Sequence, residues 1–277
     1  MRIATWNINS IRTRVDRAID FLHSSDIDVV LLQETKCRDD QFPLEPFEQA
    51  GYEVFHWGLN QWNGVAVCSR LPLSAGELGF AQMPGFDKNG GAGEAEARAV
   101  SVTVDQLRLW SVYVPNGRGL DDPHMAYKLQ WLSALGHHIR SERERHPGLE
   151  VLVGGDFNIA PRHEDVGDPD VVEGLSTHVS AAERGALEEF LATAGLVDLV
   201  RPTVPEGYTY WDYTKGKFAK NQGMRIDFLF GTEELLESVI GAELVRSQRT
   251  GEQPSDHIPV VVELGSDDDI ADKPMVF

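Results

Sequence analysis

The stretch Val29-Val30-Leu31-Leu32-Gln33-Glu34, residues 29–34, indicates the fold most directly. Four apolar residues in succession are typical of a strand that is buried on both faces. The run ends in an amide and a carboxylate, where the strand meets a loop, and functional groups gather at such strand ends. We therefore expect a layered α/β domain with its functional groups along one edge of a sheet.

Strand-like runs recur along the chain on both sides of this stretch. We expect further strands at 2–8, 52–57, 64–69, 98–104, 108–114, 150–154, 225–230 and 258–264. Residues 124–146 and 180–194 have the pattern of amphipathic helices, and Asp16 is expected to cap a third helix. The sequence shows no repeat and no linker, so we expect one domain over residues 1–264 and an acidic tail over 265–277.

The composition is that of a globular protein with a strong acidic excess. The chain has 277 residues and a formal net charge of −19, which by itself favours small or cationic substrates over nucleic acid. Two cysteines, Cys37 and Cys68, are too few for a disulfide framework or a cysteine zinc site. The N-terminus lacks the pattern of a signal peptide, and no apolar run is long enough to span a bilayer. We therefore expect a cytoplasmic protein with no membrane contact.

Polar and acidic residues recur where the predicted strands meet loops. They are Asn7, Glu34, Asp156, Asn158, Asp227, Asp256 and His257. Mg²⁺ prefers oxygen ligands, typically one or two carboxylates with water and substrate phosphate. Glu34 and Asp256 are suitable carboxylates, and Asn7 and Asn158 supply neutral oxygens.

The same set contains groups that act on a phosphodiester. Asp156 is placed to polarise a water for attack on phosphorus, and His257 to donate to a phosphate oxygen while Asp227 orients it. This pattern predicts metal-assisted phosphodiester hydrolysis. Each motif alone also occurs in ordinary turns and loops, so the prediction depends on their recurrence at successive strand ends.

Seven sequence blocks then carry a family likeness, which runs from Trp6 to Leu264. The blocks are WNINSIR from Trp6, LQETK from Leu32, VYVPNG from Val112, GGDFNIAP from Gly154, YWDY from Tyr210, RIDF from Arg225 and PSDHIPV from Pro254. In these blocks the chain resembles the exonuclease III family of class II apurinic/apyrimidinic endonucleases, within the endonuclease/exonuclease/phosphatase superfamily. The resemblance implies a four-layered α/β sandwich, with two packed mixed or antiparallel sheets flanked by helices.

The resemblance also implies an activity and roles for the residues. The activity is that of a Mg²⁺- or Mn²⁺-dependent DNA repair nuclease, which cuts on the 5′ side of abasic sites and removes nucleotides or blocking groups from 3′ ends of duplex DNA. Glu34 would be the principal metal ligand, with Asn7 and Asp256 close by. Asp156 would activate the water or protonate the leaving group, and Asn158 would orient the water. Tyr113 would act on the scissile phosphate, and His257 with Asp227 would stabilise the transition state.

Several alternatives stay open at this point. A phosphatase acting on lipid or inositol phosphates would share the Asn, Glu, Asp-x-Asn and Asp-His positions, although LQETK, YVPNG and Asn221-Gln222-Gly223-Met224-Arg225-Ile226-Asp227 favour the DNA-repair branch. A non-catalytic DNA-binding scaffold is the other alternative, and the intact set of polar residues argues against it. Tyr113 lies in an apolar run, so it would otherwise be read as a core tyrosine.

The expected DNA contacts lie mainly in the second half of the chain. The resemblance suggests that Tyr210, Met224 and Ile226 line a pocket for an abasic sugar, that Arg118 enters the duplex, and that Trp211 and Asn221 belong to the DNA-binding set. The alternative, strongest for Trp211, is that these aromatics are core residues.

Charge is distributed unevenly along the chain. Residues 1–17 carry four arginines against one aspartate, and residues 209–225 carry four cations against one aspartate. Residues 142–206 hold 14 acidic and 5 basic residues. Because charges are screened over about 8 Å at physiological ionic strength, local patches decide binding, so we expect the two basic segments to face DNA.

One further segment resembles a partner motif. Gln106-Leu107-Arg108-Leu109-Trp110 is similar to the pentapeptide by which bacterial repair proteins bind the sliding clamp. The alternative is that these residues form a hairpin tip and the strand that leads to Tyr113. We expect the protein to be a monomer.

Overall fold

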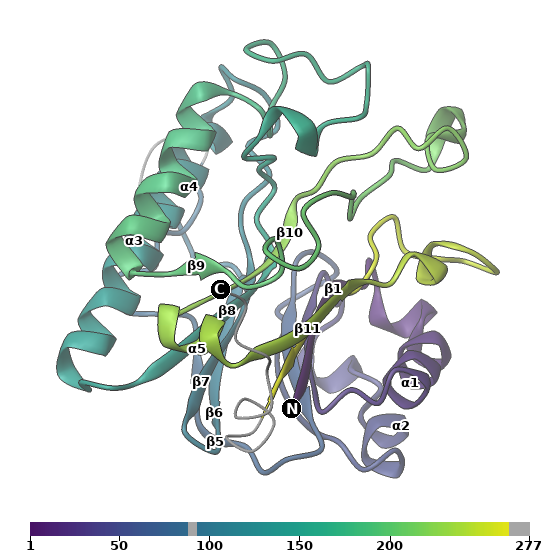
Figure 1. Ribbon diagram of the computed structural model, residues 1–277, viewed down its shortest axis with the longest axis vertical. Helices are drawn as coiled ribbons and strands as arrows, with labels where there is room; N and C mark the ends of the chain where they lie inside the picture. The colour runs from purple at the N-terminus through teal and green to yellow at the C-terminus, as the bar shows by residue number, and fades with distance from the viewer. Residues whose placement is uncertain (88–92, 266–277) are drawn as a thin grey trace, which may run out of the picture.

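Two six-stranded sheets form the centre of the computed structural model, which describes residues 1–87 and 93–265 (Figure 1). The first sheet has the order β11 (Val239–Leu244), β12 (Val260–Leu264), β1 (Arg2–Asn7), β2 (Val29–Gln33), β4 (Val65–Ser69) and β3 (Glu53–Trp57). The second has the order β5 (Ser74–Leu78), β6 (Ala99–Val104), β7 (Leu107–Tyr113), β8 (Glu150–Asp156), β10 (Asp227–Gly231) and β9 (Val197–Asp198). Each sheet contains one parallel pair, β1–β2 or β7–β8, among antiparallel neighbours, so both are mixed, as predicted.

Helices cover the outer face of each sheet. The helices α1 (Val15–Ser24) and α2 (Leu44–Gln49) lie against the first sheet, and α3 (Pro123–Arg145) and α4 (Ala181–Ala194) against the second (Figure 1). The short helix α5 (Glu233–Glu237) follows β10. Single 3-10 turns lie at Ile11–Thr13, Asp39–Gln41, His163–Asp165, Thr214–Gly216 and Arg246–Arg249. The predicted four-layered sandwich is confirmed. No helix in the described part of the chain has the length and apolarity needed to cross a bilayer.

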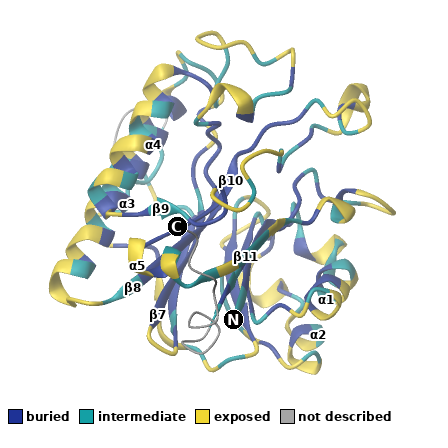
Figure 2. Ribbon diagram, in the orientation of Figure 1, coloured by how far each residue is buried: buried dark blue, intermediate teal, exposed yellow. Residues whose placement is uncertain are grey.

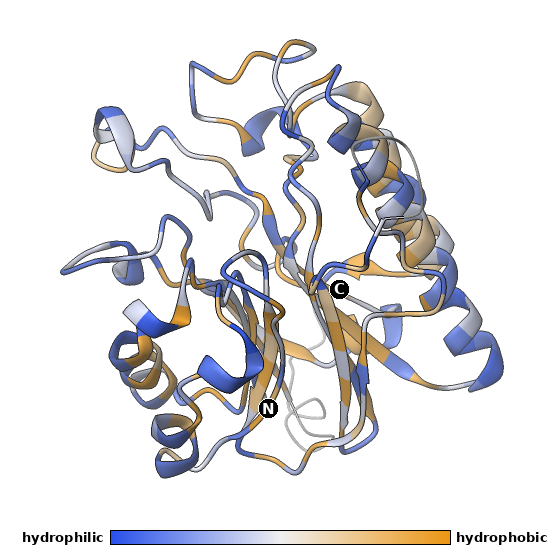
Figure 3. Cartoon of the chain, turned by 180° about the vertical axis from the view of Figure 1, so that it is seen from behind, coloured by the Kyte–Doolittle hydropathy of each residue, from blue (hydrophilic) through white to orange (hydrophobic). Residues whose placement is uncertain are grey.

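The run Val29–Leu32 packs on both faces, as its sequence indicates. Val29 and Leu31 belong to the apolar cluster between the two sheets, while Val30 and Leu32 belong to the cluster under α1 and α2. Successive side chains on a strand point to opposite faces, so a strand in the middle of four layers needs apolar residues at every position. Figure 2 shows the strands buried between exposed outer helix faces, and Figure 3 shows the same strands to be largely hydrophobic.

A glycine in the central strand β8 permits the close approach of the two sheets. A β-carbon on Gly154 would lie 2.5 Å from Cδ1 of Leu31, in the opposite sheet, and 2.7 Å from Cδ2 of Leu229. Gly154 therefore faces the space between the sheets. By strand alternation Asp156, two residues further on, faces the same space at the end of the strand.

The same alternation turns the other polar strand-end residues inward. Ile3, Leu109 and Leu229 lie in the cluster between the sheets, so Asn7, Tyr113 and Asp227 share their faces. Register completes the arrangement, since Tyr113 and Asp227 both pair with Asp156, from the two strands that flank β8. At one end of the inter-sheet space, polar side chains thus replace the apolar side chains that fill the rest of it.

The structure departs from the sequence-based expectation at several elements. The helix predicted to begin at Asp16 begins at Val15, with Arg14 at the N-cap position and Asp16 in the first turn. Strands β5, β9 and β11 and helices α2 and α5 were not predicted. The residues of β5 are exposed throughout and β11 is a partly buried edge strand, so neither has the apolar pattern of a central strand. Apart from Gly265, the predicted acidic tail lies outside the described residues.

Candidate active site

Asn7 connects the two sheets at the polar end of the inter-sheet space. Its side-chain Nδ2 donates to Oε1 of Glu34 at 2.8 Å and to Oδ2 of Asp156 at 2.9 Å. The first contact stays within one sheet, and the second crosses to the other. Asn7 is fully buried, and its Oδ1 accepts from the backbone of Asn9, so the direction of its amide is fixed. A donor shared by two carboxylates holds them next to each other.

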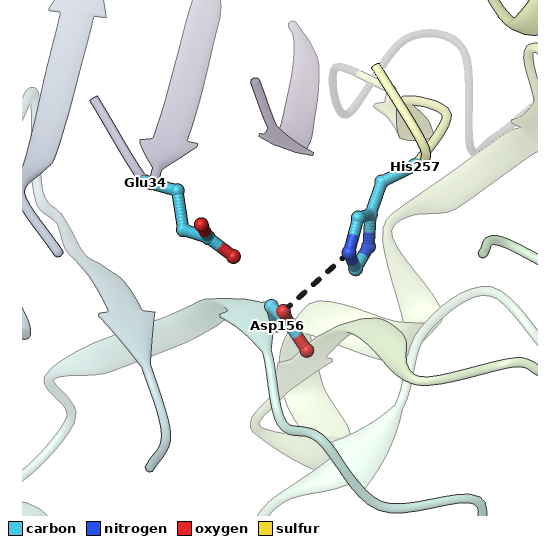
Figure 4. A group of neighbouring side chains, drawn as sticks. All are labelled: Glu34, Asp156 and His257. Atoms are coloured by element: carbon cyan, nitrogen blue, oxygen red, sulfur yellow. Dashed lines mark ion pairs between the residues drawn. The ribbon is translucent and has the colours of Figure 1, made fainter. Parts of the chain in front are cut away.

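Glu34 follows β2 and presents its carboxylate toward Asp156 (Figure 4). Burial acts to raise the pKa of Glu34, but Lys36, whose Nζ lies 2.7 Å from Oε2, and the Asn7 amide outweigh it and hold the pKa below its usual value. Glu34 therefore stays ionised, and it is the natural anionic ligand for a cation at this position.

Asp156 is the most perturbed carboxylate of the site. Burial raises its pKa to about 7, with Asp227 and Glu34 also raising it and the positive charge of His257 and the Asn7 amide opposing them. Its Oδ1 accepts from the backbone N–H of Asn158 at 2.9 Å. A carboxyl group with a pKa near neutrality exchanges a proton readily at physiological pH.

His257 and Asp227 form a buried pair beside Asp156. Nδ1 of His257 lies 2.8 Å from Oδ2 of Asp227, and Oδ2 also accepts from Oγ1 of Thr209 at 2.6 Å. Burial alone would lower the pKa of His257, but Asp227 and Asp156 outweigh it and raise the pKa to about 10. The ring is therefore an imidazolium at neutral pH. Its Nε2 lies 3.8 Å from Oδ2 of Asp156 (Figure 4).

Tyr113 ends β7, with its ring beneath the guanidinium of Arg98 at 4.9 Å from the ring centroid. Burial and the negative charge of Glu34 raise the pKa of Tyr113 well above its usual value. The phenol therefore keeps its proton and acts as a hydrogen-bond donor. Tyr113 lies near Glu34 and Asp156 and also packs against the apolar cluster between the sheets, so it has core contacts as well, and its role in the site stays a prediction.

Asn158 lies beside this group with its side chain turned toward the loop after β7. Its Nδ2 donates to the carbonyl of Val114 at 3.0 Å, and its Oδ1 accepts from Nδ2 of Asn116 at 3.1 Å. Asp256 is also set apart, since its Oδ1 accepts from Nδ2 of Asn9 at 2.9 Å. In the described residues, the group spaced to share one ion consists of Glu34, Asp156 and His257, whose ligand atoms lie within 4.8 Å of one another.

The donor set of this group fits a hard divalent cation. Glu34 and Asp156 offer carboxylate oxygens on either side of the Asn7 amide. The imidazolium of His257 has no free lone pair, so the histidine is not a ligand in this protonation state. One or two carboxylates are the usual protein contribution to a Mg²⁺ or Mn²⁺ site.

The residues predicted to line a sugar pocket are next to His257. The ring of Tyr210 lies 4.9 Å from the ring of His257, centroid to centroid. Met224 and Ile226 are almost completely buried and form a small apolar cluster against which Tyr210 packs. Of these three residues, the half-buried Tyr210 is the one with accessible surface, and Met224 and Ile226 lie beneath it.

The other predicted DNA-binding residues are placed differently from one another. Arg118 is exposed in the loop after β7, with φ of 59°, and Asn221 is exposed and accepts from Arg246 at 2.9 Å. Trp211 is fully buried, with its ring against Phe218. Its inclusion among the DNA contacts was wrong for this conformation, because a side chain with no exposed surface cannot reach a ligand.

The structure also corrects the charge argument. Lys217 is buried and forms ion pairs with Asp168 and Asp170, and Lys215 pairs with Asp170 at 2.9 Å. Arg225 is fully buried before β10. Of the four cations in this segment, Lys217 and Arg225 are therefore internal and Lys215 is paired with an acid, whereas Lys220 is exposed. In the first segment Arg2 pairs with Glu263 at the far end of β1, while Arg12, Arg14 and Arg17 line a surface recess of about 550 Å³.

The segment Gln106–Trp110 is mostly core. Gln106 is exposed in the turn before β7, but Leu107, Leu109 and Trp110 are buried in the two apolar clusters that flank the second sheet. Side chains buried in this way are not available to a partner protein. The structure gives the sliding-clamp interpretation no support.

Several residues that act in the site were not predicted individually. Asn9 and Lys36 lie in quoted motifs, and Lys36 Nζ donates to Oδ1 of Asn9 at 2.6 Å. Thr209 and Ser255 are fully buried, and their hydroxyls contact Asp227 and the backbone of Asn7. Their positions beside Tyr210 and Asp256 were the only signal in the sequence. Supporting hydroxyls have no spacing pattern of their own.

Comparison with known proteins gives consistent matches over nearly the whole chain. The sequence model described as the endonuclease/exonuclease/phosphatase family matches residues 4–257. An exodeoxyribonuclease of Bacillus subtilis (strain 168) is 31% identical over 270 residues, which cover 94% of this chain and 98% of that protein.

Two solved structures have the same fold. A 3′ phosphatase, NExo, from Neisseria, bound to a product DNA hairpin, superimposes with a TM-score of 0.88 at 32% identity, over 96% of this chain and 100% of that one. An AP endonuclease from Archaeoglobus fulgidus has a TM-score of 0.85 at 32% identity, over 95% of this chain and 99% of that one.

Proposed function

Because the chain belongs to the endonuclease/exonuclease/phosphatase family, on its exonuclease III side, we propose that it is a metal-dependent hydrolase of DNA phosphodiester bonds. It cuts duplex DNA on the 5′ side of abasic sites and removes nucleotides or blocking groups from 3′ ends. The observation that carries this proposal is the buried contact between Asn7, Glu34 and Asp156, with the His257–Asp227 pair beside it.

The two carboxylates that share the Asn7 amide would hold the cation. They are Glu34 and Asp156, and the Asn7 amide fixes both of them. When bound, a divalent cation offsets the negative charge of the scissile phosphate and of the transition state. We propose Mg²⁺ as the physiological ion and Mn²⁺ as a substitute, since both take oxygen ligands.

The protein side chains supply the proton transfers and the fixed charges. Asp156 takes the proton of the attacking water or gives one to the leaving oxygen. His257 donates from Nε2 to a non-bridging phosphate oxygen, and Asp227 keeps the ring charged and oriented. Tyr113 keeps its phenol proton and donates it in a hydrogen bond to the same phosphate.

The substrate surface surrounds this edge of the sheets. Tyr210 beside His257 gives an apolar wall suited to a base-free deoxyribose, and Arg118 extends from the loop after Tyr113. The relatives support duplex DNA with abasic sites or 3′ ends, because they include an exodeoxyribonuclease, a 3′ phosphatase with DNA and an AP endonuclease. We also propose that the enzyme is a monomer.

One assay tests the proposal. Three duplexes, with an abasic site, a recessed 3′ end or a 3′-phosphate, are incubated with Mg²⁺, with Mn²⁺ and with chelator. We expect cleavage or phosphate release with either ion and none with chelator. Absence of activity on all three duplexes, or full activity in chelator, would reject the proposal. Inositol phosphates and phospholipids, tested in parallel, separate it from the phosphatase alternative.

A further inference from the structure

The backbone of Asn158 is held in an uncommon conformation by contacts on every side. Its φ is 53°, in the left-handed region that few non-glycine residues occupy. Its N–H donates to Oδ1 of Asp156 at 2.9 Å, so the conformation of Asn158 sets the position of that carboxylate. Its carbonyl oxygen accepts from Nζ of Lys128 at 2.7 Å and from Nδ1 of His178 at 2.5 Å.

Lys128 is a fully buried cation near the start of α3. Besides the Asn158 carbonyl, its Nζ contacts Oε1 of Glu183 on α4 at 2.5 Å and the carbonyl of Asn116 at 3.4 Å. The two carbonyls belong to the loops that follow Tyr113 and Asp156. One ammonium group thus ties both catalytic loops to the helical layer.

Glu183 is held as firmly as its partner. It is fully buried, and its Oε1 also accepts from the N–H of His178 at 2.9 Å and from Oγ1 of Thr177 at 3.0 Å. Its Oε2 accepts from Oγ of Ser180, the N-cap residue of α4, at 2.6 Å. The carboxylate is therefore fixed by the start of the helix.

A buried ion pair of this kind is an inefficient way to gain stability. The desolvation of two charges can exceed their attraction, and an apolar pair of similar volume often stabilises a core equally well. The geometry of the Lys128–Glu183 pair suits a different task, because three ammonium protons can be aimed at three fixed acceptors. Those acceptors are Glu183 and the carbonyls of Asn116 and Asn158.

We propose that Lys128, held by Glu183, is a positioning residue that fixes the left-handed backbone of Asn158 and, through its N–H, the carboxylate of Asp156. This inference rests on the proposed nuclease function for its kinetic consequence. Its structural consequence, a rigid segment from Asp156 to Asn158, does not depend on any activity.

The test replaces the pair by neutral side chains of similar size. The double variant Lys128→Met/Glu183→Gln removes both charges together, so neither is left buried without a partner. We expect its kcat on abasic duplex to fall about 10- to 100-fold, as when a supporting residue behind an active-site ligand is lost. KM should stay within about 3-fold, because no group that binds DNA has changed. The midpoint of urea unfolding should stay close to that of the parent.

A second buried pair on the same helix provides the matched control. Nε of Arg108 lies 2.9 Å from Oε1 of Glu142 on α3, at the opposite end of β7 from Tyr113. Arg108→Met/Glu142→Gln should leave kcat unchanged. If both double variants lose kcat equally, or if Lys128→Met/Glu183→Gln keeps at least half of the parent kcat, the proposal is wrong.

Amide hydrogen exchange gives the readout that does not need activity. Exchange at the Asn158 N–H should become faster in Lys128→Met/Glu183→Gln than in the control double variant, measured against the exchange of α3 in the same samples. If the Lys128 double variant does not fold, Lys128→Met/Glu183→Met, an apolar pair that also leaves no buried charge without a partner, replaces it in the comparison. Unchanged exchange at Asn158 would overturn the proposal. An inactive parent protein with faster exchange in the variant would instead reject the nuclease function and leave the positioning role in place.

Discussion

His257 and Asp227 form a buried ion pair, with Nδ1 of the imidazole 2.8 Å from the carboxylate. Asp227 is the first residue of β10, and His257 lies in the loop just before β12. Both have almost no exposed surface. Asp227 is also held by the hydroxyl of Thr209. The pair therefore presents a fixed positive charge on the side of the ring that faces Asp156.

His257 and Asp227 should contribute to kcat as one unit, so that removing both should cost little more than removing His257 alone. We expect His257→Ala to lower kcat by about 10²–10⁴-fold, the usual effect of losing a positioned proton donor. Adding Asp227→Asn to His257→Ala should cost little more, because Asp227 acts through the ring. Single-turnover cleavage of abasic duplex by both single variants and the double variant measures this. Losses that multiply in the double variant would show that the two residues act separately. His163→Ala, which changes an exposed histidine, is the control.

Acid should destabilise the protein through a histidine outside the site. Burial lowers the pKa of His56 to about 4 from its ordinary 6.5, more than the nearby Asp39 carboxylate raises it. Between these pH values the unfolded chain binds a proton that the folded chain does not. The free energy of unfolding therefore falls as pH decreases from 6.5 toward 4, by at most about 1.4 kcal/mol per pH unit for this group.

Urea unfolding at several pH values tests both the direction of this pH dependence and its assignment to His56. The variant His56→Gln should be less stable at pH 7 but should lose less stability than the parent on acidification to pH 4.5. His163→Gln, at a position whose side chain is 93% exposed, should lose as much stability per pH unit as the parent. An unchanged slope in His56→Gln would contradict the prediction.

The inter-sheet space should not accept one added methyl group at Gly154. A β-carbon there would lie 2.5 Å from Cδ1 of Leu31, so Gly154→Ala should destabilise the fold by about 1–3 kcal/mol. A β-carbon on Gly185, in α4, would meet no atom within 4 Å, so Gly185→Ala should be neutral or stabilise by up to about 1 kcal/mol. Thermal unfolding of both variants tests this. Equal stability of the two would show that the sheets can separate.

The affinity of this protein for DNA should fall less steeply with salt concentration than is usual for a nuclease. Lys217 and Lys215 are paired with aspartates and Arg225 is buried, so the cations near the site that can meet phosphates are mainly Arg12, Arg14 and Arg118. About three neutralised phosphates correspond to a slope of log K against log salt near −3. Fluorescence anisotropy with a Ca²⁺-supported, uncleaved duplex gives the slope. A value near −8 would mean that many more phosphates are bound.

Much of the fold was predictable because the patterns that specify it are local. The run Val29–Leu32 has apolar residues at every position, and only a central strand in a layered fold needs that. The strands that were missed, β5, β9 and β11, are edge strands with exposed or partly buried residues. They pair because a neighbouring strand leaves hydrogen-bonding groups free, and their own residues carry no comparable pattern.

The candidate site was predictable in its residue types and only partly in its geometry. Asn7, Glu34 and Asp156 each follow an apolar strand, and alternation along those strands turns them toward a common space. Trp211 shows where the reasoning failed, since an aromatic residue beside a motif reads the same whether it is exposed or buried. Lys217 shows the same failure for charge, because its partners Asp168 and Asp170 lie more than forty residues away.

The sequence by itself determined the layered α/β architecture, the chemical types at the strand ends and the family resemblance. Each of these is written in short runs of residues, through side-chain alternation and strand-end motifs. Only the tertiary structure decided that Asp156 has a pKa near neutrality, that His257 is charged, and that Lys217 and Arg225 of the second basic segment are internal. Those properties are sums of burial and Coulomb interactions over groups from distant segments, and folding alone brings such groups within a few ångströms of one another.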